Sequence, residues 1–328
     1  MRRLGVLLLV LVGLVALLAP TLAVHPVEKQ HRDFVLAPPM RLHVVDASGR
    51  LRAPFVYQVR LVDRLSRTYR ANESHPLTVQ WLAAGRLGAL PGDVPWFPLG
   101  TDSLGRDVWS RLVAGSRLSL GLALAACLGA LLIGGALGGW AGAAGGWVDD
   151  LVMRLSEFIF VLPALYVVLV LRGSLPLVLP APALFVGLAL VLALVGWPTV
   201  ARAVRAVVSA EAASDYAVAA RAAGATRARV LFVHLLPAAL PVLGTQALLL
   251  APAFIMAEAT LSYVGLGFMP PTSSWGTMLQ ESANVHAFAD SPWLLSPAVA
   301  LALVVLGLNL ALGERAASLD TLPSRSGQ

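Results

Sequence analysis

Charge is what this 328-residue sequence lacks most. Only 13% of its residues are Asp, Glu, Lys or Arg, where about 25% is usual for a soluble domain. Hydrophobic residues make up 58% of the chain, and the mean hydropathy is +0.77. The few charges also leave long uncharged runs between them. This composition excludes an ordinary soluble domain and predicts an integral membrane protein.

Cysteine and lysine are nearly absent, and each absence excludes a class of site. The single cysteine, Cys127, permits neither a disulfide framework nor a cysteine-based metal site within one chain. The only lysine is Lys29, so the Gly-x-x-x-x-Gly-Lys phosphate loop is missing. The motifs His-Glu-x-x-His and Gly-x-Ser-x-Gly are missing too. We therefore expect no catalytic residues, no cofactor and no metal, and any energy source must be an ion gradient or another protein.

A net charge of +6 and a pI near 10.2 raise the question of nucleic-acid binding. The basic residues are almost all arginines scattered between apolar runs, without the aromatic-interleaved basic stripe of such proteins. We expect no nucleic-acid partner, and we interpret the arginines as the basic flanks of membrane spans in contact with lipid.

Six apolar runs are long enough to cross a bilayer, which takes about 20 residues. They are Leu4–Val24, Leu118–Val148, Leu151–Leu171, Gly173–Ala201, Leu235–Ala257 and Trp293–Gly313. Six crossings place both termini on one side. The basic segment between the fourth and fifth runs predicts that this side is the cytoplasm, because short loops rich in arginine stay inside.

The first run allows two interpretations. Its basic start, apolar centre and Thr21-Leu22-Ala23 also fit a cleaved signal peptide. The run reaches Val24, which is long for a signal peptide and favours a retained span.

The segment between the first two spans is the most soluble-looking part of the chain. Met40–Val45 and Pro54–Val62 are β-prone and flank a turn-rich connection, and Thr78–Leu82 is a third candidate strand. Within Pro54–Val62 the residues alternate as in a half-buried strand. We predict a small β-rich insertion, at the lower limit of independent folding.

Two patterns concern helix packing. The second run repeats glycine at four-residue spacing (Gly134, Gly138, Gly142), which lets helices approach closely in lipid. In the third run Arg154 and Glu157 lie three residues apart, and we expect them to pair on one helix face.

The segment 202–236 carries the clearest functional signal. Ser209–Ala223 is rich in alanine and strongly helix-forming, Gly224 interrupts it, and Ala225–Leu236 predicts a second helix that runs into Pro237. An alanine-faced helix with a glycine pivot suits docking into a groove on another protein.

The spacing in this segment resembles the "EAA loop" of ABC importer permeases: Ala219-Ala220, then Gly224, then His234-Leu235-Leu236-Pro237. Further blocks resemble the dipeptide/oligopeptide/nickel branch and its second, C-type permease. These blocks are Pro98–Arg111, Gly115–Leu120, Gly145–Asp149 with Met153-Arg154, Ala257–Ser262, Gly265–Gly267 and Pro270–Gly276.

This resemblance implies the type I ABC importer permease fold, a retained first span and a bacterial cytoplasmic (inner) membrane location with both termini cytoplasmic. It implies four partners: a second homologous permease chain, two cytoplasmic ATPase subunits and an extracytoplasmic solute-binding protein. It also implies that the elbow couples to an ATPase, through Ala219, Ala220, Arg221, Gly224, Ala225 and Thr226.

The sequence departs from the family pattern at one position. Val218 stands where the motif has glutamate, and the literal Glu211-Ala212-Ala213 lies seven residues too early. We therefore expect the elbow without a specific glutamate contact.

The predicted fold is an all-α membrane protein with a β-rich extracytoplasmic insertion. We divide it into a first span (1–24), the insertion with an amphipathic segment (25–112), a five-helix permease core (113–315) that contains the coupling loop 202–236, and a cytoplasmic tail (316–328).

The alternative function is a gradient-driven transporter or channel, which would need ionisable groups at mid-membrane. A membrane-embedded enzyme would need clustered catalytic residues. The substrate-binding residues stay unknown, and peptide is favoured over nickel because the spans hold no cluster of metal ligands.

Overall fold

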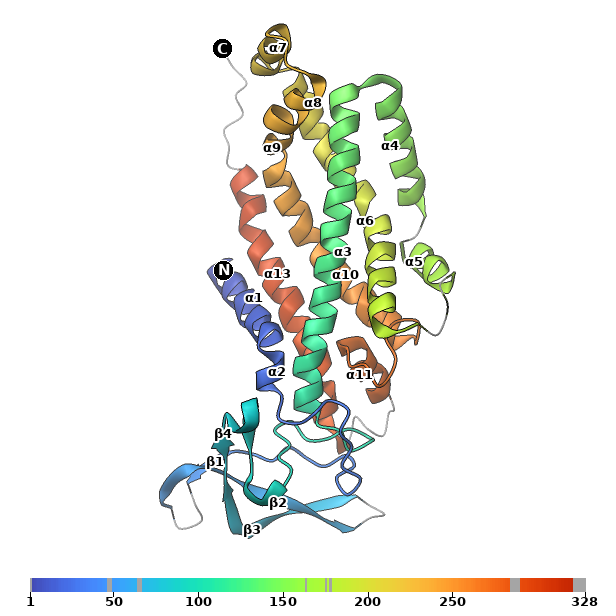
Figure 1. Ribbon diagram of the computed structural model, residues 1–328. Helices are drawn as coiled ribbons and strands as arrows, with labels where there is room; N and C mark the ends of the chain where they lie inside the picture. Colours follow the sequence, from blue (N-terminus) through green and yellow to red (C-terminus); the bar gives the residue numbers. More distant parts are fainter. Residues whose placement is uncertain are drawn as a thin grey trace. The chain divides into compact units, whose positions relative to one another are not determined.

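The computed structural model describes residues 2–45, 49–63, 67–162, 164–174, 176, 179–283 and 290–320. In this part of the chain, four helical segments are long and apolar enough to span a membrane (Figure 1). Three of them are α3 (Val108–Ala144), α6 (Ala181–Ala212) and α10 (Leu240–Tyr263), and the fourth, Pro292–Leu312, includes the first part of α13 (Ser296–Asp320). The prediction of a multi-pass helical membrane protein is confirmed.

Each of the other two predicted spans is divided into two helices. The first run forms α1 (Arg2–Leu17) and the short α2 (Ala19–Leu22). With 16 residues, α1 is roughly 24 Å long, against a hydrocarbon core of about 30 Å. The third run forms α4 (Gly146–Val161) and α5 (Ala164–Gly173), a pair bent by 94°. Pro163 lies between them in the sequence and has no N–H to continue a helix.

The predicted boundaries of two spans were wrong for identifiable reasons. The fourth span begins at Ala181 rather than Gly173, because Pro180 precedes the helix and Pro182 lies in its first turn, where proline is favoured. The second span begins at Val108, ten residues before the predicted start, and ends at Ala144. Gly145 and Gly146 follow it with φ of +63° and +57°, which ends the helix.

The described chain divides into two compact units, which are considered separately. The first contains 1–6, 121–258 and 305–328, and the second contains 7–120 and 259–304. Besides the long helices, the first unit holds α7 (Asp215–Ala222), α8 (Arg227–Arg229), the π-helical turn η3 (Val230–Leu235) and α9 (Leu236–Ala238). The tail residues 321–328 lie outside the described part.

Glycines let α3 pack closely on α6 in the first unit, as their spacing predicts. A Cβ on Gly134 would lie 2.6 Å from the Trp197 carbonyl oxygen, and one on Gly138 would lie 2.3 Å from that of Ala201. Both distances are shorter than any van der Waals contact, so larger side chains would push the helices apart.

An ion pair fastens α4 to α6. The Arg205 guanidinium donates through Nε to Asp149 Oδ1 at 2.9 Å, and its Nη2 bonds Oδ2 of the same carboxylate. The predicted pairing of Arg154 with Glu157 is wrong: both side chains are exposed, and no ion pair joins them. Exposed residues on a helix surface gain little from pairing, so their spacing alone does not hold them together.

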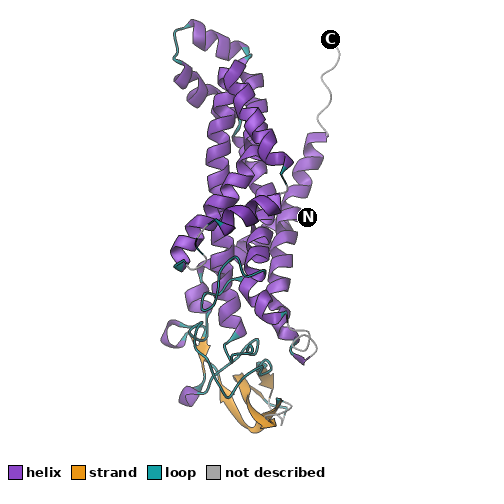
Figure 2. Ribbon diagram, turned by 90° about the vertical axis from the view of Figure 1, so that its right-hand side faces the viewer, coloured by secondary structure: helices purple, strands orange, loops and turns teal. Residues whose placement is uncertain are grey.

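The second unit contains the predicted β-rich insertion (Figure 2). Its strands are β1 (His43–Val45), β2 (Leu51–Asp63), β3 (Thr68–Thr78), β4 (Gln80–Trp81) and β5 (Gly88–Ala89). The first three form an antiparallel sheet in the order β1-β2-β3, and β4 pairs with β5. The unit's short helical elements are η1 (Ala83–Gly85), η2 (Pro91–Asp93), α11 (Trp275–Ser282) and η4 (Pro292–Leu295).

The sheet corrects two expectations about the insertion. Strand β3 was not predicted, and it tolerates Pro76 because it lies at the edge of the sheet, where a missing N–H costs no ladder bond. The expected alternation in β2 fails because Phe55 and Val56 are both buried. The register between β2 and β3 shifts between Tyr57 and Val59, and such a bulge redirects the side chains.

A hydrophobic core gives the insertion its own stability. Val56, Val59 and Val79 pack with Trp96 and Phe97, and all five are buried. Residues from outside the strands complete this core: Val24, Ala37, Met40 and Leu90.

Candidate coupling site

The elbow begins where α6 ends, four residues later than the predicted start of its first helix. Residues 209–212 continue α6, so the loop 202–236 is helical through Ala212. Ala213 and Ser214 form the break, with the Ala213 N–H bonded to the Ala210 carbonyl at 3.2 Å. The Ser214 backbone is extended, and its hydroxyl donates to the Glu211 carbonyl at 2.6 Å. Ser214 thus stops α6 and starts α7.

Helix α7 has only eight residues, and small alanine side chains lie on both its buried and its exposed side. Ala217 is fully buried and packs in a cluster with Val204 and Val208 of α6 and Val230 of η3. The opposite side carries Val218, Ala219 and Arg221, which are exposed. The small side chain of alanine allows the backbone of α7 to pack closely on α6. On the exposed side, Ala219 covers little of the helix backbone.

Gly224 closes α7 with a hydrogen-bonding pattern that requires a left-handed residue. Its φ is +83°, its N–H bonds the Arg221 carbonyl at 3.0 Å, and the Ala225 N–H bonds the Ala220 carbonyl at 3.1 Å. These two bonds make a Schellman motif, in which glycine is favoured because a Cβ is strained at positive φ. Ala220 and Ala225 both pack on the same cluster, completing the motif's apolar contact.

The segment that connects α7 to α10 begins at Thr226. Its hydroxyl accepts a hydrogen bond from the Arg229 N–H at 3.3 Å, capping α8. The chain then makes the π-helical turn η3, closed by a bond from the Leu236 N–H to the Leu231 carbonyl. Pro237 has no N–H to donate to the carbonyl four residues earlier, and the wider turn ends just before it. The predicted second helix, Ala225–Leu236, is therefore three short pieces.

Two polar contacts tie α7 to the end of α6. The Tyr216 hydroxyl donates to Glu211 Oε2 at 2.5 Å, and Arg221 Nη2 donates to the Ala212 carbonyl at 2.5 Å. The bond to the Glu211 carboxylate raises the pKa of Tyr216. Both contacts cross the break at Ala213-Ser214, so they fix the angle at which α7 leaves α6.

The six predicted coupling residues all lie at the end of α7 and in the following turn. Ala219, Arg221, Gly224 and Thr226 are exposed, whereas Ala220 and Ala225 are half-buried. Val218, at the motif's glutamate position, is exposed as well. Glu211 lies on α6 rather than on α7. Sequence reasoning missed the contact between Tyr216 and Glu211, because no periodicity links residues across a helix break.

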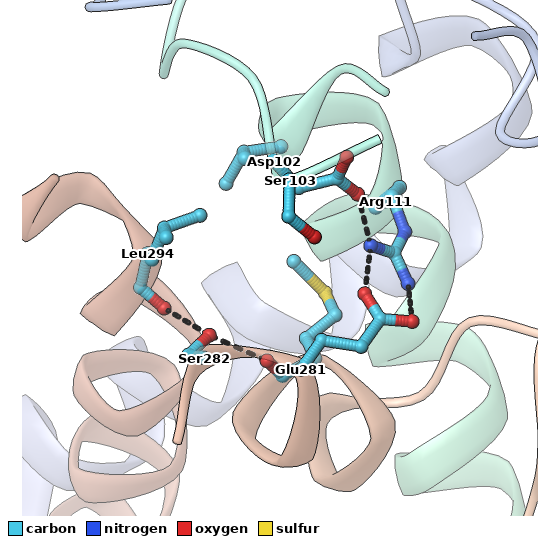
Figure 3. Close-up of a pocket in the computed structure, with 8 residues that line it drawn as sticks. Asp102, Ser103, Arg111, Glu281, Ser282 and Leu294 are labelled. Atoms are coloured by element: carbon cyan, nitrogen blue, oxygen red, sulfur yellow. Dashed lines mark hydrogen bonds and ion pairs between the residues drawn. The ribbon is translucent and has the colours of Figure 1, made fainter. Parts of the chain in front are cut away.

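A second site, in the second unit, is a buried charge cluster that the sequence did not predict. Figure 3 shows Arg111 reaching from α3 toward Glu281 of α11, with Asp102 on the other side of its guanidinium. Arg111 Nη1 lies 2.5 Å from both Asp102 Oδ2 and Glu281 Oε2, and Nη2 lies 3.1 Å from Glu281 Oε1. Arg106 bonds the same two carboxylates at 2.7 Å each.

We call the cluster of Asp102, Arg106, Arg111 and Glu281 the clamp, because its ion pairs connect two segments of the fold. Two arginines and two carboxylates balance in charge, and Arg106, Arg111 and Asp102 are almost entirely buried. The cavity beside them has a volume of about 10 Å³, enough for one water at most. The cluster therefore fastens α11 to the start of α3 and has no room for a substrate.

Asp107 directly precedes α3, beside this clamp. Its Oδ2 accepts bonds from the Ser110 N–H at 3.1 Å and from the Ser110 hydroxyl at 2.5 Å. Burial raises the pKa of Asp107 to about 7, although these hydrogen bonds oppose the shift. No group of three or more His, Cys, Asp or Glu residues in the described chain is placed to hold a metal ion.

Comparison with known proteins identifies the family. The model of the family described as "Binding-protein-dependent transport system inner membrane component" matches residues 134–313, more than half of the chain. The chain is 32% identical to the di/tripeptide transport system permease protein DppC of Pseudomonas aeruginosa, over 93% of this chain and 83% of that protein. It is 35% identical to the oligopeptide transport system permease protein OppC of Bacillus subtilis, over 67% and 69% of the two chains.

Among solved structures, the chain is similar to one described as inward-facing conformations of the MetNI methionine ABC transporter. The identity is 21% and the TM-score 0.49, over 64% of this chain and 96% of that one. The sequence matches alone establish the family. The chain belongs to the binding-protein-dependent transport system inner membrane components, and it is a pore-forming permease subunit of an ABC importer.

Proposed function

We propose that this permease imports peptides or related small solutes, and that the elbow formed by α7 and the Gly224 turn couples it to a separate ATPase. The names of the relatives support the peptide substrate, since two of them are permeases of di/tripeptide and oligopeptide transport systems. The exposed, alanine-faced end of α7 carries the coupling proposal.

The shape of the elbow supports docking. Ala219 and Gly224 leave the backbone accessible, and a built Cβ at Gly224 meets no atom within 4 Å. A groove on an ATPase could contact the backbone there directly. The buried Ala217 packs α7 on Val204 and Val208 of α6, and Tyr216 and Arg221 add two surface contacts between the two helices. A push on α7 then moves α6 with it.

The same proposal includes the partners and the location. A complete importer of this kind would contain a second homologous permease chain, two cytoplasmic ATPase subunits and an extracytoplasmic solute-binding protein. The chain would lie in the bacterial cytoplasmic membrane with both termini and the elbow inside. It would itself hydrolyse no ATP, consistent with its lack of a phosphate-binding loop.

Cysteine cross-linking tests the coupling proposal. Cys127 is buried, and a Cys127→Ala background would leave the chain without thiols. In that background Ala219→Cys should cross-link to a co-purified ATPase subunit, identified by mass spectrometry. Arg70→Cys, which is exposed on β3, is the matched control and should not. Cross-linking of both positions, or of neither while the ATPase co-purifies, would contradict docking at the elbow.

Competition tests the substrate. Transport in proteoliposomes containing the whole importer should be inhibited by unlabelled di- and oligopeptides. Inhibition by nickel but not by peptides would overturn the peptide proposal while leaving the coupling proposal intact.

A further inference from the structure

The second unit contains a cavity separate from the charge cluster around Arg111. Its volume is about 410 Å³, within the range of small-ligand pockets. Its walls come from three segments: the residues after α2, the stretch from η1 to β5, and the approach to α3. The lining residues are Val24, His25, Lys29, Ala83, Arg86, Gly88, Ala89, Leu90, Val94 and Trp96.

The polar lining of this cavity is basic. Lys29 and Arg86 carry positive charge, and no acidic side chain is among the lining residues that the structure describes. Burial, together with the nearby positive charges of Lys29 and Arg86 and with His31, lowers the pKa of His25 to about 4, although the hydrogen bond to Trp96 opposes the shift. His25 is therefore neutral at pH 7, and its Nε2 lies 2.9 Å from the Trp96 carbonyl oxygen. The surplus charge of the cavity comes from Lys29 and Arg86.

Trp96 adds an unused donor. Its side chain is 2% exposed, and within the described chain its indole N–H has no hydrogen-bond partner. Its ring is part of the cavity wall, and Leu90 and Val94 add further apolar surface.

The cavity begins where the first apolar helix ends. Leu17 and Leu18 are exposed, as expected for side chains that face lipid, and Val24 already lines the cavity. The end of this helix is fixed to α3: the Trp109 indole donates to the Leu22 carbonyl at 2.8 Å. The N–H groups of Val24 and His25 both bond the Ser110 hydroxyl at 2.9 Å. In the proposed topology this helix crosses the membrane, and a cavity directly beyond its end then lies at the level of lipid headgroups.

We propose that this cavity binds the phosphate of an anionic lipid headgroup, with Lys29 and Arg86 as its charge partners. Arginine suits phosphate because its planar guanidinium donates two parallel hydrogen bonds, and lysine adds a point charge. Basic residues near a membrane surface also attract anionic lipid over long range. The glycerol part of the lipid would contact the apolar wall.

Native mass spectrometry of the purified importer tests the proposal, with phosphatidylglycerol as the anionic probe and phosphatidylcholine as the zwitterionic one. The double variant Lys29→Gln/Arg86→Gln should bind phosphatidylglycerol about tenfold more weakly or worse, since it loses two charge-assisted contacts. Arg60→Gln/Arg70→Gln is the matched control, because it removes two exposed charges from the same unit outside the cavity. It should bind phosphatidylglycerol as the unmodified protein does.

The conservative variant Lys29→Arg/Arg86→Lys keeps both charges and should retain binding, which separates charge loss from misfolding. Equal loss of phosphatidylglycerol in the two glutamine variants would overturn the proposal. So would equal binding of phosphatidylcholine and phosphatidylglycerol to the unmodified protein. Binding of inorganic phosphate at Lys29 and Arg86 without binding of phosphatidylglycerol would also overturn it, in favour of a soluble anion.

Discussion

Replacing Gly224 by valine should open the elbow without disturbing anything around it. The residue has a φ of +83°, and a built Cβ meets no atom within 4 Å, so the substitution causes backbone strain and no clash. A residue with a Cβ at this positive φ lowers the stability of the turn by about 1–2 kcal/mol, and a β-branched residue such as valine is at the upper end of that range. A loss of about 2 kcal/mol raises the open fraction of the elbow roughly 30-fold.

Limited trypsin digestion measures this opening, because Arg221, Arg227 and Arg229 flank the turn. When opening and closing are fast, cleavage follows the open population, so Gly224→Val should be cut about 10- to 30-fold faster there. Gly224→Asn should be cut only slightly faster, since asparagine tolerates positive φ. Gly13→Val is the matched control, because Gly13 is helical and its built Cβ also meets no atom within 4 Å.

The same variant should transport less solute per ATP hydrolysed when assembled with its partners. Membrane insertion should be unchanged. If Gly224→Val were cleaved at the unmodified rate, the strain argument would be wrong. If cleavage rose but transport per ATP did not change, the turn would be strained as described and yet not be the coupling element.

Three further outcomes follow from buried groups and close contacts. Arg111→Met should lower the free energy of unfolding by about 3–5 kcal/mol, seen as a fall in Tm, because it leaves Glu281 paired only through the neighbouring arginine; an unchanged Tm would refute the clamp. The pKa of Asp107 is raised to about 7, so the folded state holds its proton more tightly than the unfolded state. The contribution of Asp107 to the free energy of unfolding is then largest below about pH 4 and falls by up to about 1.4 kcal/mol per pH unit toward pH 7; in Asp107→Asn, Tm measured between pH 5 and 8 should lose this part of its slope. Gly138→Ala should lower Tm, since its Cβ would lie 2.3 Å from a backbone oxygen of α6, whereas Gly135→Ala, with 3.7 Å to its nearest neighbour, should not.

Much of the membrane architecture follows from the sequence alone. Long uncharged runs must be helical in lipid, because the bilayer offers no other partner for backbone N–H and C=O groups. The glycine repeat at Gly134, Gly138 and Gly142 indicated which face of α3 lies against another helix. The break at Gly224 likewise follows from local residue chemistry, since glycine favours the left-handed turn that ends α7.

Other features depended on residues far apart in the chain. The clamp joins Asp102, Arg106 and Arg111 to Glu281, about 170 positions later, and no local pattern indicates that an exposed-looking glutamate pairs with them. Strand β3 was missed because its polar sequence gains stability only at the edge of a sheet, and the bulge in β2 displaced the expected alternation.

The sequence by itself determined the class of the molecule, the six apolar segments and the position of the elbow, because each depends on local hydrophobicity or on a single residue's backbone freedom. Only the tertiary structure showed that α6 continues to Ala212 and which charged side chains pair. It also showed that Lys29 and Arg86 line the same cavity. Those features depend on contacts between distant segments, whose free energies arise only when burial removes the side chains from water.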